Sequence, residues 1–253
     1  TWSRAEISDE MTVDPEQNKK WRMGESQFSA KPKNAWELGL ALGHFHINGD
    51  VPSDIPSGFG VGLHLRKAIN YIFSWRVEVF YSTARGLDGR LTSPEVLNLD
   101  NDDTNLSDRT YRNFVATNFS GGVSLMANIG NLLFHKPRNK WNFNVGIGAI
   151  VTSAEVKMDY LNGGTAYDWS SIEAQHSSNT RQKRNDIRAA LDGETDHIAE
   201  NNRNVPSFLH DNGMVFPSFL ATVGVSRKIN KRINISLEHQ TIAQDFDKWD
   251  GHE

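Results

Sequence analysis

Glu78 and Glu238 are the residues whose type and setting come closest to a catalytic pair. Each lies in a segment in which polar and apolar residues alternate, so each points to the polar face of a strand. Two carboxylates on such a face can act as general acid and general base. They can equally form ion pairs with a buried arginine. We favour ion pairing, because no nucleophile elbow or HExxH motif accompanies them.

Three further stretches have residue types that bind cations. The acidic run at 98–107 lacks the glycine and the distal glutamate of a calcium loop, so we favour a solvated loop over incidental calcium binding. His44 and His46 could chelate a metal, but no third ligand is near in sequence. We therefore place them at the outer rim of a barrel. The segment DGETDHIAE at 192–200 contains His197 and carboxylates without a recognised metal spacing.

Other cofactor chemistry also lacks support in the sequence. GFGVG at 58–62 resembles a phosphate-binding loop, but no helical pattern follows it. The chain has no cysteine, which excludes thiol catalysis and cysteine-bound metals. We expect no enzymatic activity, no metal and no cofactor.

Composition narrows the class of protein further. The net charge of −4 argues against general nucleic-acid binding. The mean hydropathy is −0.54, and no apolar run reaches the length of a membrane helix. Transmembrane β-barrels remain possible, because their alternating strands are hydrophilic on average.

The elements that would position these residues are seven segments of alternating polarity. Each is roughly as long as the 9–11 tilted residues that cross a bilayer, or longer. They occupy residues 35–47, 58–66, 73–84, 114–130, 140–158, 218–226 and 233–242.

The connections between these segments also alternate. Short basic turns at 66–71, 135–140 and 227–232 are interleaved with long polar connections. The long connections cover 48–57, 85–112 and 159–213, and a short helix that stops at Asp192-Gly193 is expected in the last. Short turns on one side and long loops on the other are typical of outer-membrane barrels. The sequence therefore predicts an all-β, eight-stranded antiparallel transmembrane β-barrel with long extracellular loops, of which seven strands are visible.

The two faces of each strand predict what each face touches. Apolar side chains would face lipid, and aromatic rings would lie at headgroup depth. We expect one aromatic girdle near the short turns, formed by Trp36, Phe73, Trp75, Trp141 and Phe143. The small and polar face would fill a narrow lumen. There we expect an ion-pair network centred on Arg76 that includes Glu37, Glu78 and Glu238.

Several runs resemble the N-terminal barrel of OmpA-family outer-membrane proteins of Bacteroidota. The resemblance covers about residues 35–250 and rests on GDVPS, GFGVGLHLRK, FNVGIGAIVTSAEVKMDYLNGG and NKRINISLEH. It implies an eight-stranded barrel followed by a periplasmic peptidoglycan-binding domain. In that case residues 1–34 form a polar periplasmic arm and residues 35–253 form the barrel. The eighth strand and any peptidoglycan-binding domain are then expected beyond Glu253, although the arm or a partner could donate the strand.

We expect a structural outer-membrane protein of a Gram-negative bacterium that links the membrane to peptidoglycan. Its partners would be membrane lipid, lipopolysaccharide, peptidoglycan and possible outer-membrane neighbours, but no nucleic acid. One alternative is an accessory subunit of a machine for barrel assembly, type IX secretion or nutrient uptake. A small diffusion pore is a further alternative.

Overall fold

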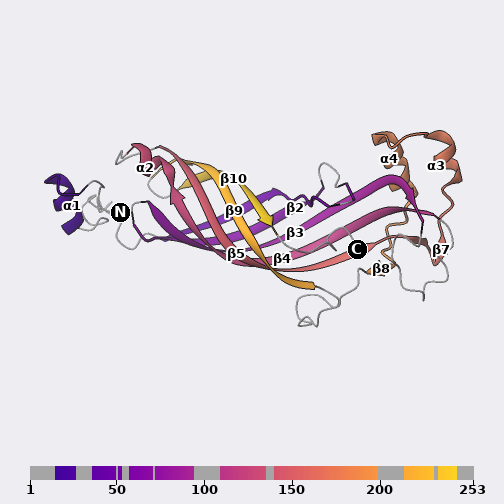
Figure 1. The fold of residues 1–253 in the computed structure, drawn as a ribbon, viewed down its shortest axis with the longest axis horizontal. Coiled ribbons are helices and arrows are strands. Elements are labelled where there is room, and N and C mark those ends of the chain that lie inside the picture. The colour runs from indigo at the N-terminus through magenta and orange to yellow at the C-terminus, as the bar shows by residue number, and fades with distance from the viewer. Residues whose placement is uncertain are drawn as a thin grey trace, which may run out of the picture.

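In the computed structural model, the described chain is all-β and is dominated by one strongly curled antiparallel sheet (Figure 1). The described residues are 15–26, 36–49, 51–52, 57–70, 72–93, 109–134, 140–198, 214–230 and 233–243. The seven long strands are β1 (Trp36–His44), β2 (Phe59–Ala68), β3 (Phe73–Thr92), β4 (Thr110–Asn128), β5 (Trp141–Met158), β9 (Met214–Lys228) and β10 (Asn234–Ala243). The short strands are β6 (Leu161–Asn162), β7 (Thr165–Ala166) and β8 (His197–Ile198), and the helices are α1 (Pro15–Arg22), α2 (Ile129–Phe134), α3 (Ser170–Gln175) and α4 (Arg181–Ala190).

Each long strand pairs with the next in the order β1-β2-β3-β4-β5-β9-β10, while β8 pairs with the end of β5. All seven predicted segments coincide with a long strand, and the all-β, antiparallel prediction is confirmed. The helix expected before Asp192-Gly193 is α4.

Two of the short connections share one turn geometry. The Asn70 side chain accepts the N–H groups of Ile72 and Phe73, and the Asn230 side chain accepts that of Ile233. A side-chain amide that replaces a backbone acceptor is the usual reason for asparagine in turns.

The structure differs from the sequence-based expectation in three places. The stretch 85–112 is not one loop, since β3 continues to Thr92 and β4 begins at Thr110. The segment predicted to run to residue 130 ends at Asn128, whose side chain accepts the N–H of Asn131 in α2. Helix α3 and, within the N-terminal arm, helix α1 had no clear periodic signal.

The lengthened strands divide the sheet into two regions. The band is the part of the sheet nearer the short turns. It covers β3 up to Tyr81, β4 from Phe119 onward and β5 up to Val151, together with the strands beside them. The cap consists of residues 84–92, 110–117 and 153–198, including α3 and α4. Figure 1 shows β3, β4 and β5 extending to the end of the molecule that bears these helices.

β1 and β10 are the edges of the path, and no pairing joins them in the described part of the chain. Both strands run in the same direction, because an even number of antiparallel steps separates them. An antiparallel closure of this sheet therefore needs one further strand between them.

Candidate functional site

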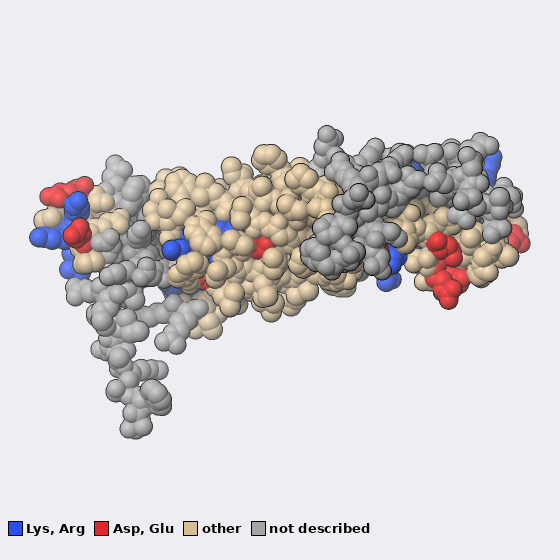
Figure 2. Space-filling view, turned by 90° about the horizontal axis from the view of Figure 1, so that it is seen from below, with Lys and Arg blue, Asp and Glu red and all other residues tan. Residues whose placement is uncertain are grey.

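The outer face of the band is apolar around the whole sheet. It exposes leucine, valine, isoleucine and aromatic side chains from every long strand, among them Leu38, Leu40, Leu42, Phe59, Leu63, Val79, Tyr81, Phe119, Val123, Ile147, Phe219, Val223, Ile235 and Leu237. Figure 2 shows that charged atoms are sparse along the middle of the visible face and gather toward its two ends. Exposed apolar surface of this extent marks contact with a membrane or another protein.

The inner face of the band is closely packed and mostly polar, although Met126, Ile150 and Leu220 are also buried there. Asn118, Ser120, Ser124, Asn144, Thr152 and Ser226 are all buried there. Ser120 and Thr152 share a hydrogen bond of 2.9 Å, and Asn144 donates to Ser226 at 3.1 Å. A Cβ atom at Gly148 would lie 2.3 Å from the carbonyl oxygen of Val123, so a side chain at that position would displace the neighbouring strand.

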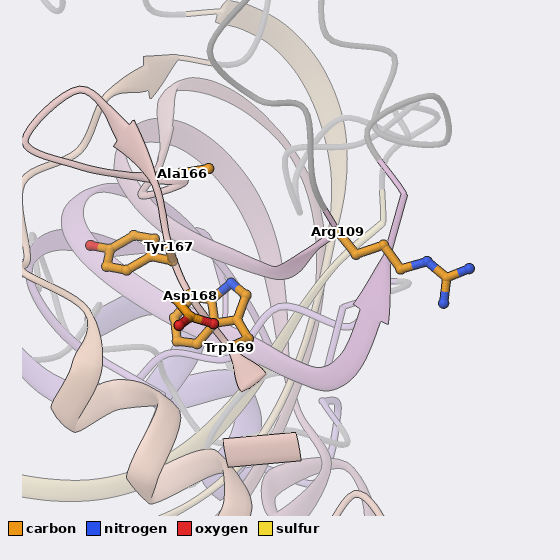
Figure 3. A pocket seen from close by; sticks show the side chains of 5 residues that line it. All are labelled: Arg109, Ala166, Tyr167, Asp168 and Trp169. Carbon is orange, nitrogen blue, oxygen red and sulfur yellow. The ribbon is translucent and has the colours of Figure 1, made fainter. Parts of the chain in front are cut away.

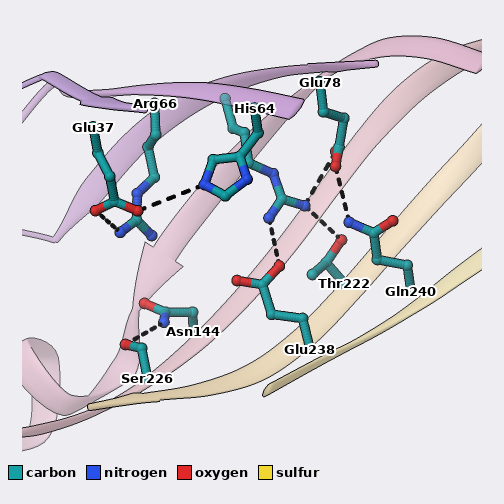
Figure 4. A network of polar contacts seen from close by, with 10 residues as sticks. Glu37, His64, Arg66, Glu78, Asn144, Thr222, Ser226, Glu238 and Gln240 are labelled. Atoms are coloured by element: carbon teal, nitrogen blue, oxygen red, sulfur yellow. Dashed lines mark hydrogen bonds and ion pairs between the residues drawn. The ribbon is translucent and has the colours of Figure 1, made fainter. Parts of the chain in front are cut away.

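Arg76 is the centre of the interior. It is 1% exposed and pairs with Glu238 at 2.6 Å and with Glu78 at 3.1 Å. It also donates to Thr222 at 3.2 Å, and Gln240 donates to Glu78 at 2.9 Å (Figure 4). These contacts join β3 to β9 and β10, which are not its neighbours in the sheet, so they form across the curled interior.

Glu37 lies outside the Arg76 network with which the sequence grouped it. Its carboxylate accepts from Arg66 at 2.5 Å and lies 3.6 Å from His64 (Figure 4). The register explains this separation, because Glu37 stands directly opposite Arg66 in the β1–β2 pair. Strand alternation identified the face of Thr222 and Gln240 but could not identify their partners, because those contacts cross the interior.

The five aromatic residues of the expected girdle all lie near the short-turn end of the sheet. Trp36 and Trp75 meet edge to face with ring centroids 5.5 Å apart. Lys67 lies 4.8 Å above Trp36, and Arg227 lies 5.2 Å above Trp141. Phe73 and Phe143 are exposed on the same outer face. Cations stacked on these rings place positive charge at this border of the apolar band.

The cap reverses the arrangement of the band, because its interior is apolar. One cluster includes Phe114, Ala116, Ala154, Val156, Met158 and Tyr160, and a second consists of Leu87, Tyr111, Tyr167, Trp169, Ile172 and Ile187. The second cluster fastens α3 and α4 to the ends of β3 and β4.

Glu173 of α3 links these helices to β4. It accepts from the Tyr111 hydroxyl and from Lys183, whose ammonium lies 2.5 Å away. The Lys183 hydrogen bond, followed by that of Tyr111, lowers the pKa of Glu173. Burial, followed by the bond to this carboxylate, raises the pKa of Tyr111. Glu173 stays ionised and Tyr111 keeps its proton. Their contacts with Lys183 therefore hold α3, α4 and β4 together.

Asp159 is the most perturbed carboxyl of the cap. Burial, together with the charges of Asp192 and Asp196, raises its pKa to about 6, against the hydrogen bonds donated by Tyr167 and Gly193. A raised pKa can mark a catalytic acid. Here the carboxylate instead accepts bonds that fasten the segment after α4 to the end of β5.

A pocket of about 470 Å³ opens beside this cluster and is lined by Arg109, Ala166, Tyr167, Asp168 and Trp169 (Figure 3). Asp168 accepts the N–H of Ser170, which lowers the pKa of its carboxyl. Tyr167 and Trp169 stack on each other and are largely buried. None of the five lining residues pairs a nucleophile with a base, so the pocket has no catalytic arrangement.

The cation candidates that lie in the described part of the chain make contacts other than metal ligation. His44 and His46 stack with centroids 6.5 Å apart, and the His44 ring accepts the N–H of Ser57. Asp196 accepts backbone N–H groups of residues 160 and 161, while the acidic run 98–107 lies outside the described residues. No group of three metal-ligating side chains occurs in the described part of the chain. None of the helices within the described ranges is long and apolar enough to cross a membrane.

Comparison of the chain with protein-family models, curated proteins and solved structures finds no match. The chain itself combines an apolar outer band, a mostly polar interior and a separately packed cap.

Proposed function

We propose that this chain is an integral β-barrel protein of the outer membrane of a Gram-negative bacterium, with a structural role. One observation carries the proposal: an apolar outer face that encircles the sheet encloses a polar, hydrogen-bonded interior. In water this arrangement would expose a far larger apolar surface than soluble monomers carry. In lipid it is the expected order, with apolar residues outside and polar residues inside.

Lipid imposes a second requirement on this sheet. Backbone N–H and C=O groups cannot remain unpaired in hydrocarbon, so a spanning sheet has to close. The proposal therefore includes one further antiparallel strand between β1 and β10, which gives eight strands. The partners that contact the band are then outer-membrane lipid and lipopolysaccharide.

The link to peptidoglycan is the part of the proposal that rests on sequence resemblance to the OmpA family of Bacteroidota. In that family, a domain after the barrel holds the cell wall. Co-sedimentation of the full-length protein with purified peptidoglycan tests this part. A full-length protein that stays in the supernatant would contradict the tether while leaving the barrel untouched.

Single cysteines test the membrane position directly, because the chain has none of its own. Ile147→Cys places the thiol on the outer face of the band, Thr152→Cys in the interior and Lys157→Cys on the cap. Each variant is labelled with a small polarity-sensitive fluorophore in denaturant, refolded into lipid vesicles and exposed to quenchers.

We expect blue-shifted emission at residue 147 that a lipid-phase quencher reduces and aqueous iodide does not. Aqueous iodide should quench the emission of the probe at residue 157. Iodide quenching of residue 147 in a folded protein, shown by heat-modifiable migration on gels, would overturn the proposal.

The cap favours a second role, as an accessory subunit of a larger outer-membrane complex. Three strands run well beyond the band and carry a packed helical unit, which offers a surface to a partner above the membrane. Purification from native membranes in mild detergent tests it. Co-migration with a large complex supports this role, and a protein of the mass of a lone barrel argues against it.

A further inference from the structure

A buried aspartate organises several arginines on the cap. Asp88 is fully buried at the end of β3. Its carboxylate pairs with Arg90 at 3.0 Å and with Arg112 at 3.2 Å, and it accepts from Asn179 at 3.2 Å. Burial acts to raise the pKa of Asp88, but the bonds from Arg90 and Arg112 outweigh it and the pKa is lowered. Asp88 therefore holds these side chains in place as an ionised carboxylate.

Asn179 extends the cluster to α4. Its side-chain oxygen accepts from Arg184 at 3.0 Å while its amide group donates to Asp88. Two guanidinium groups thus pair with one carboxylate, and a third, that of Arg184, is linked to it through Asn179, so the cluster holds a surplus of positive charge. Arg90 is 69% exposed, so part of this surplus faces solvent with donors oriented in advance. Fixed guanidinium forks of this kind match phosphate and carboxylate groups.

The same surface continues along α4. Arg181, Arg184 and Arg188 fall within roughly 60° of the helix circumference, since successive residues are about 100° apart. Asp186 lies on the other side of the buried face, where it binds His176. The positive groups therefore form a row beside the Asp88 cluster, which suits a ligand with several negative charges along its length.

The distance from the band indicates what such a ligand is. Arg90 follows Tyr81 by nine residues, and Arg112 precedes Phe119 by seven. With a rise of about 3.3 Å per residue and a tilt of about 40°, the cluster stands roughly 20 Å beyond the apolar band. Lipid headgroups lie directly at the border of hydrocarbon and do not extend to this height. A saccharide chain that carries phosphate or carboxylate groups does.

We propose that Arg90, Arg112 and Arg184, held by Asp88 and Asn179 and extended by Arg181, form a binding site for an anionic saccharide. The saccharide half of this inference rests on the proposed function, which places the cap outside the cell. The anion half rests on the cluster alone.

The test titrates the purified protein in detergent micelles by calorimetry, after heat-modifiable migration has shown that it is folded. The probes are a hexamer of galacturonate, the neutral maltohexaose and inorganic phosphate. The double variant Arg181→Gln/Arg184→Gln removes two charges and leaves the contacts of Asp88 with Arg90 and Arg112 intact. The matched control, Arg85→Gln/Lys157→Gln, removes two charges elsewhere on the cap.

We expect the galacturonate hexamer to bind the wild type, and the Arg181/Arg184 variant to bind it at least about fivefold more weakly. The control should stay within about twofold, and maltohexaose should not bind. Equal weakening in both double variants would overturn the site, and so would an absence of binding to the wild type. Phosphate that binds as tightly as the hexamer would overturn the saccharide half.

The acidic run 98–107 lies between Arg90 and Arg112 in the sequence, so the test includes it as a competitor for these arginines. Binding that appears only after Asp100, Asp102 and Asp103 are changed to Asn would overturn the proposal, because the arginines would then serve this chain. A failed titration of a correctly inserted barrel counts against the site alone. A band cysteine open to water counts against the proposed function, whatever the titration gives.

Discussion

The band and the cap are built from the same strands with opposite polarity. Along β5, the outward residues from Trp141 to Val151 are apolar and exposed, and they change to Ser153, Glu155 and Lys157 in the cap. The inward residues change in the other sense, from Asn142, Asn144, Gly146 and Gly148, with the apolar Ile150 after them, to Ala154, Val156 and Met158.

This inversion is the pattern expected if, as proposed, lipid surrounds the band and water surrounds the cap. Where lipid is outside, burial of polar groups in hydrogen-bonded pairs stabilises the interior. Where water is outside, burial of apolar area is the larger favourable contribution. Under the proposed function, the change between Val151 and Ser153 marks the border between lipid and water on β5.

The largest expected effect distinguishes the two kinds of interior. Arg76→Leu leaves the buried Glu78 and the partly buried Glu238 without their cation, so we expect a loss of about 3–5 kcal/mol in the free energy of unfolding. Equilibrium unfolding in detergent measures it. Arg66→Leu is the matched control, because Glu37 is 36% exposed and such a pair contributes about 0–1 kcal/mol. Equal losses in the two variants would remove the distinction between the two ion-pair sites.

The outer face of the band gives the next effect. Ile147→Arg places a charge on the lipid side, which costs about 2–4 kcal/mol near the bilayer centre. Thr83→Arg lies on the outward face of β3 beyond Tyr81, where about 0–1 kcal/mol is expected. Unfolding in lipid vesicles measures both. Similar costs at residues 147 and 83 would place the border of the band elsewhere.

A smaller effect tests whether the cap behaves like a water-soluble unit. Thr180 caps α4 by accepting the N–H of Lys183. Thr180→Ala should destabilise α4 by about 1 kcal/mol, read as faster amide hydrogen exchange in residues 181–190. Exchange in the band should stay unchanged, and Ser178→Ala serves as the control. Faster exchange throughout the band would show that cap and band unfold together.

The smallest effect depends on pH and is confined to the cap. The folded-state pKa of Asp159 is about 6, above the ordinary value of 3.8, so folded protein holds a proton that unfolded protein has lost between about pH 4 and 6. Stability of this segment therefore rises as pH falls through that window. Hydrogen exchange in residues 191–198, corrected for intrinsic rates, should slow from pH 7 to pH 5. Asp159→Asn should lose this response, and a variant that keeps it would assign the response to another group.

Much of the sheet could be predicted from the sequence, because alternation is a local property. The seven strands and the place of α4 follow from neighbouring residues. The division of the interior into two ion-pair groups does not, since Arg76 meets Glu238 across the barrel while Glu37 is satisfied by Arg66 within its own hairpin. The Asp88 cluster could not be predicted for another reason. Residues 88, 90 and 112 lie in a stretch interpreted as a loop, and Asn179 and Arg184 come close to them only in the folded chain.

The sequence by itself determined which side of each strand is apolar, where the turns fall and that the chain has no cysteine, because these depend on residue type and short spacing. The tertiary structure decided which strand of the curled sheet faces which, and hence which charges pair. It also decided that β3, β4 and β5 extend beyond the band and enclose an apolar core in the cap. These outcomes depend on the strand register and on the curvature of the sheet. Both result from many contacts between residues far apart in the chain, so no single segment encodes them.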